Sequence, residues 1–122
     1  MTQRMKIAYI DLPLSEVYYS NQITYYTLSR DYVPLITFNI FAGDINLDET
    51  KRNAVKTLLE VADEIWIFRD ISHRNLAGIK RAKELGKTVR YFRLKKSQDI
   101  IEISNLEEVV MDEDIAMHRN EL

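Results

Sequence analysis

Apolar residues along this chain gather in short runs that are separated by longer, partly polar stretches. Residues 5–11 (MKIAYID), 32–40 (YVPLITFNI), 63–68 (DEIWIF) and 88–94 (TVRYFRL) are rich in β-branched and aromatic residues, as is typical of buried strands. A weaker run at 99–104 (DIIEIS) predicts a fifth strand. The pattern therefore predicts a sheet of four to five strands.

The stretches between the first four runs have the spacing of helices. Residues 13–30 place Tyr19, Ile23 and Tyr26 at i, i+4 and i+7, which is one face of a helix. Two more helices are predicted, one over residues 49–62 and one from Leu76 to a glycine cap at Gly86. Their expected inner faces are Ala54, Leu58 and Val61 in the first, and Leu76, Ile79, Ala82 and Gly86 in the second.

Strands that alternate with helices form parallel sheets with right-handed crossovers. We therefore expect a three-layer α/β sandwich of Rossmann-like or flavodoxin-like type, with a parallel sheet in the order 2-1-3-4. Residues 1–104 would form one domain, followed by an acidic segment over residues 105–122. Ligands of such sheets bind beyond the C-terminal strand ends, where the strand order reverses. The polar side chains expected there are Asp11, Asn39, Asp70 and Ser72, with Tyr19 reaching over from the first helix.

The charges are strongly segregated, although the formal net charge is only −2. Residues 69–96 carry ten Lys and Arg against two Asp and Glu, whereas residues 97–122 carry one against eight. The basic residues beside the apolar face of the last helix and along the next strand could bind nucleic-acid phosphates or an acidic protein groove. Alternatively, they form a solvated face that the acidic segment partly neutralises. The cations concerned are Lys80, Lys83, Lys87 and Arg90.

The acidic segment and the tyrosines are further candidates for contacts with partners. Residues 105–122 could dock as a short amphipathic helix, imitate a nucleic-acid backbone, or remain a solvated tail. Tyr18 and Tyr25 are seven residues apart and lie off the predicted inner face. Tyrosine is enriched in interface cores, so these two predict a protein-binding face, or else they pack beneath a neighbouring loop. A homodimer through this helix would satisfy either interpretation.

Composition excludes several classes of protein. The chain has no cysteine, which rules out disulfides and thiolate metal sites. Neither His73 nor His118 has a partner at metal-ligand spacing, and we expect no metal and no other cofactor. The apolar stretch near the N-terminus is too short for a signal peptide or a membrane span. We therefore expect a soluble, cytoplasmic protein with no membrane partner.

Residues 5–92 carry a series of segments that resembles a known family. The segments are KIAYIDLP, YVPLITF, ADEIWIF and S-x(6)-I-x-x-A-K-E-L-G-K-x-V-R-Y-F. In order and spacing they are similar to the nucleoside 2-deoxyribosyltransferase-like proteins, especially the small, often phage-borne, uncharacterised members. The resemblance implies cleavage of an N-glycosidic bond by a carboxylate nucleophile, a Glu early in the helix after the third strand.

This chain departs from the family at the positions that carry its chemistry. The nucleophile position is occupied by Gly78, two small or glycine positions are Arg69 and Arg74, and a histidine position is Phe38. A glycosyl-enzyme route needs a carboxylate, which glycine cannot supply. Gly78 is thus interpreted as the gap left by a lost nucleophile. Alternatively, it permits close packing of the helix on the sheet, or the helix begins after it.

The departures predict a catalytically degenerate domain that works by binding. The resemblance implies a phage or mobile-element accessory that engages a host protein or nucleoprotein complex, as an inhibitor of a defence system does. Arg69 and Arg74 would then plug the pocket or bind a phosphate in it, since an arginine fork suits phosphate.

Two alternatives to a degenerate binding domain stay open. One is an N-glycosidase or deoxyribosyltransferase that acts on nucleosides, nucleotides or NAD-like dinucleotides. It would use Asp11 and Asp70 as acid and nucleophile, although such strand-ending aspartates can also be simple caps of the following helix. The other alternative is a nucleotide sensor without chemistry.

Overall fold

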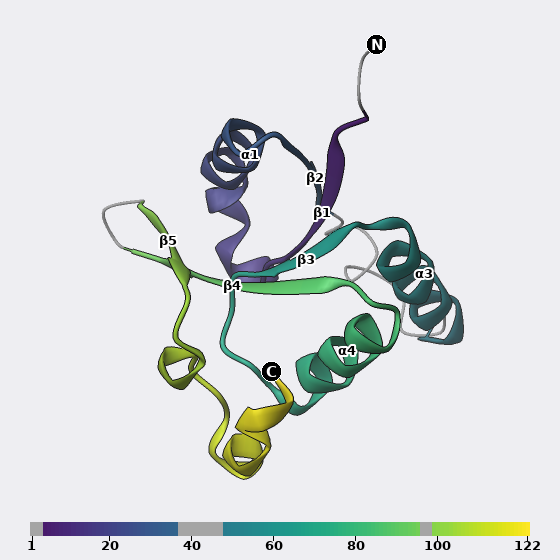
Figure 1. The fold of residues 1–122 in the computed structure, drawn as a ribbon, viewed down its shortest axis with the longest axis vertical. Coiled ribbons are helices and arrows are strands. Elements are labelled where there is room, and N and C mark those ends of the chain that lie inside the picture. Colours follow the sequence, from purple (N-terminus) through teal and green to yellow (C-terminus); the bar gives the residue numbers. More distant parts are fainter. Residues whose placement is uncertain (1–3, 37–47, 96–98) are drawn as a thin grey trace.

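The five strands of this protein form a single sheet in the order β2-β1-β3-β4-β5 (Figure 1). The computed structural model describes residues 4–36, 48–95 and 99–122. β1 pairs in parallel with β2 and β3, and β3 pairs in parallel with β4. The α/β class and the order of the first four strands are confirmed. The strands are β1 (Lys6–Asp11), β2 (Tyr32–Leu35), β3 (Glu64–Ile67), β4 (Thr88–Leu94) and β5 (Ile100–Ile103).

The last strand departs from the expected parallel sheet, because β5 runs antiparallel to β4. The Lys95 N–H donates to the Asp99 carbonyl at 3.0 Å, so the chain turns back soon after β4. A parallel pair needs a crossover of a dozen or more residues, and the short connection here leaves no room for one.

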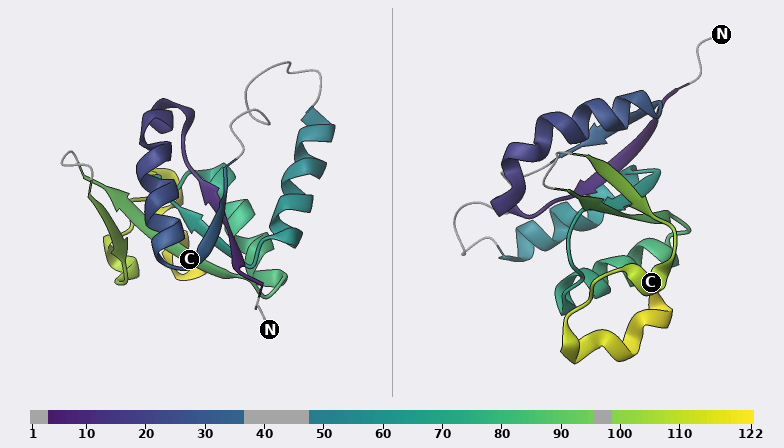
Figure 2. Two further views of the ribbon diagram at one scale, coloured as in Figure 1. Left: turned by 90° about the horizontal axis from the view of Figure 1, so that it is seen from above. Right: turned by 90° about the vertical axis from the view of Figure 1, so that its left-hand side faces the viewer.

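Helices cover both faces of the sheet (Figure 2). The 3₁₀ helix η1 and helix α1 pack on one face, whereas α3, α4 and the C-terminal 3₁₀ helix η4 lie on the other (Figure 1). This distribution follows from right-handed crossovers in a sheet whose second strand lies outside the first. The helices are η1 (Leu14–Tyr19), α1 (Ser20–Ser29), α3 (Asp48–Val61), α4 (His73–Glu84), η3 (Leu106–Glu108) and η4 (Glu113–Glu121).

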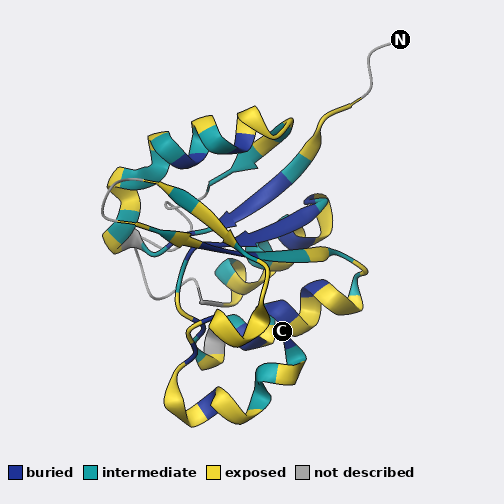
Figure 3. Cartoon of the chain, turned by 60° about the vertical axis from the view of Figure 1, so that its left-hand side comes forward, coloured by how far each residue is buried: buried dark blue, intermediate teal, exposed yellow. Residues whose placement is uncertain are grey.

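The sheet separates two apolar cores, and the central strands are buried on both faces (Figure 3). Trp66 and Phe92 belong to the core under α1, where their ring centroids lie 5.0 Å apart. Ile67 and Tyr91 belong to the core under α3 and α4. Successive side chains of β3 and β4 point to opposite faces of the sheet. The same two strands therefore contribute residues to both cores.

Two of the three predicted helix faces are confirmed. Ile23 of α1 is fully buried, and Tyr19 and Tyr26 pack against the core below it. In α4, Leu76, Ile79 and Ala82 are buried, whereas Gly86, which was also expected on this face, is exposed and follows the end of the helix with a positive φ of 73°. That conformation is the usual glycine cap.

The third predicted face, on α3, is wrong at Val61, which is 53% exposed. The buried side chains are Leu59 and, just beyond the helix, Ala62, with Val55 and Leu58 packed beside them. Their i, i+3, i+4 and i+7 spacing forms the true apolar stripe, and Val61 lies outside it.

The acidic C-terminal segment docks on the domain rather than remaining a solvated tail. A short bridge pairs Ile71 with Met111, and the Ile71 N–H donates to the Val110 carbonyl at 2.8 Å. Arg119 Nη1 donates to the Leu106 and Val109 carbonyls at 2.7 and 2.6 Å. The buried apolar residues of this segment are Val109, Met111, Ile115 and Leu122.

None of the helices in the described ranges is both long and apolar enough to cross a bilayer.

Candidate functional site

Asp11, at the C-terminal end of β1, lies at the centre of a hydrogen-bonded group. Its Oδ1 pairs with Arg69 Nη1 at 3.1 Å, and its Oδ2 accepts a hydrogen bond from Asn75 Nδ2, also at 3.1 Å. Arg69 follows β3 and Asn75 lies in the first turn of α4, so three elements meet at this carboxylate. Both carboxylate oxygens are therefore engaged within the protein.

Ser72 and Asn75 fix the start of α4. Ser72 Oγ accepts from the Asn75 N–H at 3.3 Å, and Asn75 Oδ1 accepts from the Ser72 N–H at 3.0 Å. This reciprocal pair is a capping box, and it begins the helix at His73 rather than at the predicted Leu76.

Neither candidate aspartate caps the helix that follows it. The N-cap of α4 is Ser72, and the N-cap of η1 is Pro13. The interpretation of Asp11 and Asp70 as caps is therefore wrong. Asp11 instead bonds to a helix that lies far from it in the sequence.

Burial raises the pKa of Asp11 above its ordinary value of 3.8, although Arg69 and Asn75 oppose this shift by stabilising the carboxylate. Its side chain is 23% exposed. Raised carboxyl pKa values occur both in active sites and in structural ion pairs. Here Arg69 and Asn75 each bind one oxygen of Asp11, as in a structural ion pair.

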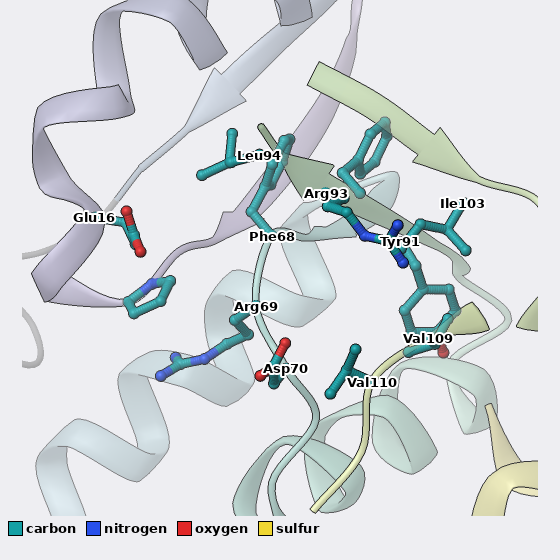
Figure 4. A pocket seen from close by; sticks show the side chains of 12 residues that line it. Glu16, Phe68, Arg69, Asp70, Tyr91, Arg93, Leu94, Ile103, Val109 and Val110 are labelled. Carbon is teal, nitrogen blue, oxygen red and sulfur yellow. The ribbon is translucent and has the colours of Figure 1, made fainter. Parts of the chain in front are cut away.

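A pocket of about 360 Å³ opens beside this group, at the C-terminal ends of β3 and β4. Four charged side chains reach it from three parts of the chain (Figure 4). Glu16 comes from η1, Arg69 and Asp70 follow β3, and Arg93 comes from β4. The apolar lining is Pro13, Phe68, Phe92, Leu94, Ile103, Val109 and Val110, together with the ring of Tyr91.

Aromatic rings form much of the pocket wall. The rings of Phe68 and Phe92 stack with centroids 4.7 Å apart and planes at 10°. Tyr91 is buried, its hydroxyl has no hydrogen-bond partner among the described residues, and burial raises its pKa to about 12. The Tyr91 hydroxyl is therefore neutral at physiological pH.

The predicted ligand-binding residues form two groups, and Arg69 belongs to both because it pairs with Asp11 and lines the pocket with Asp70. Asp11, Arg69 and Ser72 are linked through Asn75, whereas Asp70 is exposed and lines the pocket. Within the described part of the chain, no hydrogen bond joins Asp11 to Asp70. Asn39, Phe38 and the side chain of Arg74 lie outside the described residues.

Gly78 lies inside α4 and is partly buried. The interpretation that the helix begins after it is therefore wrong. A Cβ built at this position would meet no heavy atom of the described residues within 4 Å, apart from the neighbouring helix backbone. Close packing against the sheet is thus not the reason for a glycine here. The interpretation as a lost nucleophile stays a prediction.

The predicted basic patch on α4 is largely paired with the chain's own groups. Lys80 Nζ lies 2.9 Å from Glu121 Oε1, and Lys83 donates to the main-chain oxygen of Leu122. Lys87 Nζ donates to the Glu60 carbonyl at 2.9 Å. Neutralisation by the acidic segment, the second of the two interpretations of this patch, describes Lys80 and Lys83.

Arg90 points to a buried acid rather than to a partner. Its Nε lies 3.1 Å from Glu64 Oε1, and Glu64 is only 5% exposed. The Tyr32 hydroxyl and Trp66 Nε1 donate to the same carboxylate at 2.6 and 2.9 Å. This cluster joins three strands, because Tyr32 belongs to β2, Glu64 and Trp66 to β3, and Arg90 to β4. Trp66 and Arg90 are neighbours in the sheet register. Arg90 is therefore paired within the chain, and its role in partner binding stays a prediction.

Tyr18 and Tyr25 are exposed, at 68% and 77%. None of the described elements covers them, so the expected exposure is shown, whereas their role as a protein-binding face stays a prediction. Leu28 is also exposed, at 46%, and Asn21 lies between the two tyrosines in an exposed position. We call the surface formed by Tyr18, Asn21, Tyr25 and Leu28 the tyrosine face.

Several residues of the site were not predicted. Asn75 could have been found from the Ser-x-x-Asn spacing, which resembles the Ser-x-x-Gln form of a capping box. Glu16 and Arg93 reach the pocket through the fold alone, and the sequence offers no local signal for them. Among the described residues, no group of three His, Asp or Glu side chains is placed to hold a metal ion.

Comparison with known proteins leaves the chain without an assigned family. No protein-family model matches it, and no curated protein matches it.

Proposed function

We propose that this chain is a binding domain without glycosyl-transfer chemistry and that its partner is a protein. The observation that carries the proposal is the position of Gly78. It lies within α4, where the resemblance places the nucleophile, and it offers no side chain to a sugar. Covalent glycosyl transfer requires a carboxylate at bonding distance from the anomeric carbon.

The two aspartates are poor substitutes for that carboxylate. Asp11 already binds Arg69 and Asn75 with both oxygens. Asp70 is exposed and lines the pocket, and among the described residues no hydrogen bond joins it to Asp11. The alternative enzyme, which would use Asp11 and Asp70, therefore has less support than binding.

The choice of a protein over a nucleic acid rests on the surface charges. Binding to a phosphate backbone depends on free Lys and Arg side chains, and Lys80, Lys83 and Arg90 are engaged by the chain itself. The tyrosine face, in contrast, is open and contains no charged side chain. Tyrosine-rich, uncharged surfaces are typical of interface cores.

Photo-crosslinking in cells that naturally carry this gene tests the proposal. A photoreactive residue is placed at position 25 and, as a control, at Met117, which is equally exposed at 77%. We expect a discrete adduct from position 25 that is sensitive to protease and resistant to nuclease. A nuclease-sensitive adduct, or equal labelling from both positions, would contradict a protein partner at this face.

A second candidate, nucleotide binding without chemistry, is favoured by the pocket. Its lining is partly aromatic and contains two arginines, a side chain that suits a phosphate; to bind one, Arg69 would leave Asp11 and Arg93 would leave the Glu108 carbonyl. Titration with AMP and dAMP would test it, with Arg69→Gly as the variant. Loss of binding would mean that Arg69 holds the phosphate, a gain would mean that it blocks the pocket, and no binding by either protein would remove this candidate.

The cellular setting is proposed from the resemblance and the composition. A role as a phage or mobile-element accessory acting on a host protein comes from the likeness to phage-borne proteins. The cytoplasm suits a chain that has no cysteine.

A further inference from the structure

We infer that the protein on the tyrosine face is a second copy of this chain, packed antiparallel about a two-fold axis. This inference rests on the proposed function and names the partner for the same surface. It is argued from the shape of the face, its lack of charge and its area.

The exposed residues of η1 and α1 form one stripe. A 3₁₀ helix turns about 120° per residue and an α-helix about 100°. Tyr25 therefore lies within roughly 20° of Tyr18 around the common axis, with Asn21 and Leu28 within roughly 60° of them. Ile23 and Thr27, on the opposite side of α1, are fully buried.

The stripe is unusual in this chain because it carries no charge. None of residues 17–29 is charged, although 30% of the whole chain is. Such a surface meets its own copy without repulsion between like charges. Two exposed apolar residues near the C-terminus, Val110 and Met117, flank the acidic run from Asp112 to Asp114. Two copies of that surface would repel each other.

The stripe is also complementary to itself when one copy is reversed. Suppose that two copies of this helix pack antiparallel, with the two-fold axis at the height of Ile23 along the helix. Tyr18 of one copy then faces Leu28 of the second copy. Asn21 faces Tyr25 of the second copy, so an amide lies opposite a phenol. Each contact occurs twice, as an isologous interface requires. Tyr18 is already held against Tyr19, with ring centroids 4.5 Å apart, which reduces the side-chain entropy lost on binding.

The area of the face sets the expected strength. An aromatic side chain can bury about 150–250 Å². At 68% and 77% exposure, the two tyrosines offer roughly 300 Å² per copy. With Leu28, Asn21 and the neighbouring side chains we expect about 1,000 Å² in total, the lower limit for a specific interface. The dimer should therefore be reversible and depend on concentration.

Sedimentation velocity of the full chain, from roughly 1 to 200 µM, tests the inference. We expect the sedimentation coefficient to rise from monomer to dimer across this range. Tyr25→Glu places two charges in the interface and should weaken association by about tenfold or more. Met117→Glu is the matched control at 77% exposure and should behave as the unmodified protein, and circular dichroism checks that both variants are folded.

A protein that stays monomeric at every concentration would overturn the inference. It would leave the proposed function standing, because the tyrosine face would then be open to a different protein. Association that is unchanged in Tyr25→Glu and in Tyr18→Glu would also overturn it. Failure of the proposed function is seen separately, as release of a base from a nucleoside.

Discussion

Gly78 weakens α4 without making room for a side chain of any of the described residues. Glycine inside a helix is about 1 kcal/mol less favourable than alanine, and the open space around its Cα shows no packing reason for it. No packing contact with the described residues therefore explains a glycine at this position.

Gly78→Ala should raise the free energy of unfolding by about 0.5–1 kcal/mol. Alanine lowers the backbone entropy of the unfolded chain, and its Cβ meets none of the described residues in the folded protein. Urea unfolding measures the change. Gly86→Ala is the control, and it should lower stability by about 1 kcal/mol because its φ is 73°. A loss of stability in Gly78→Ala would mean that the helix packs more closely here than the structure shows.

Asp63 predicts a pH-dependent contribution to stability. The Ile7 N–H donates to its Oδ2 at 2.7 Å and, with the nearby Arg4, lowers the pKa of this carboxyl below 3.8. The stabilisation is complete above the unfolded pKa and is lost as the pH falls through the folded pKa. Asp63→Asn should therefore be about 1 kcal/mol less stable at pH 7 and should match the unmodified protein near pH 2.

The measurement for Asp63 is the urea midpoint at the two pH values. Glu113→Gln, at an exposed position, makes the same change of charge and should show little difference at either pH. A deficit of equal size at both pH values in Asp63→Asn would mean that the charge of Asp63 contributes nothing.

Single residues show where sequence patterns stop being informative. The inner faces of α1 and α4 were predictable because apolar spacing is local. The pairing of Arg90 with Glu64 was not, because these residues are far apart in the chain and meet only through the pairing of β3 with β4. The same limit applies to Arg69 and Asp11, whose contact depends on the neighbouring positions of β1 and β3.

Among the elements, the Glu64 cluster fastens three strands together. Arg90→Met would leave a carboxylate that is 5% exposed without its cation, and we expect a loss of about 2 kcal/mol in unfolding free energy. Arg93→Met, on the exposed side of the same strand, is the control and should change stability by less than about 0.5 kcal/mol. Equal stability of Arg90→Met and the unmodified protein would return Arg90 to the candidates for partner binding.

The C-terminal segment behaves as part of the core rather than as an appended tail. Ile115 is 3% exposed, whereas Met117, two residues later in the same helix, is 77% exposed. Ile115→Ala should therefore lower the unfolding free energy by about 2–4 kcal/mol, and Met117→Ala by less than about 0.5 kcal/mol. Thermal or urea unfolding distinguishes the two. Similar small effects from both would mean that this segment is only loosely docked.

The elements also show what could be predicted at this scale. Alternation of strand and helix patterns was enough for the order of β2, β1, β3 and β4. The antiparallel direction of β5 depends on a short connection, and the start of α4 depends on the side-chain bonds of a capping box. Neither is visible in the spacing of apolar residues.

For the molecule as a whole, the candidate pocket and the open uncharged surface lie in different places. The pocket lies at the strand ends, where this architecture binds ligands. The position of the implied nucleophile has no side chain, and Asp11 is bound by Arg69 and Asn75. The exposed, uncharged tyrosine face lies elsewhere, on η1 and α1. Binding of a protein is the account that joins these observations.

The most direct test of this account is a chromatographic assay of the purified chain with deoxynucleosides, their monophosphates and NAD, in the presence of a free acceptor base. The account predicts an unchanged pool of substrates. Release or exchange of a base by the unmodified chain that is abolished in both Asp11→Asn and Asp70→Asn would contradict it, and would mean that these two carboxylates carry out the chemistry.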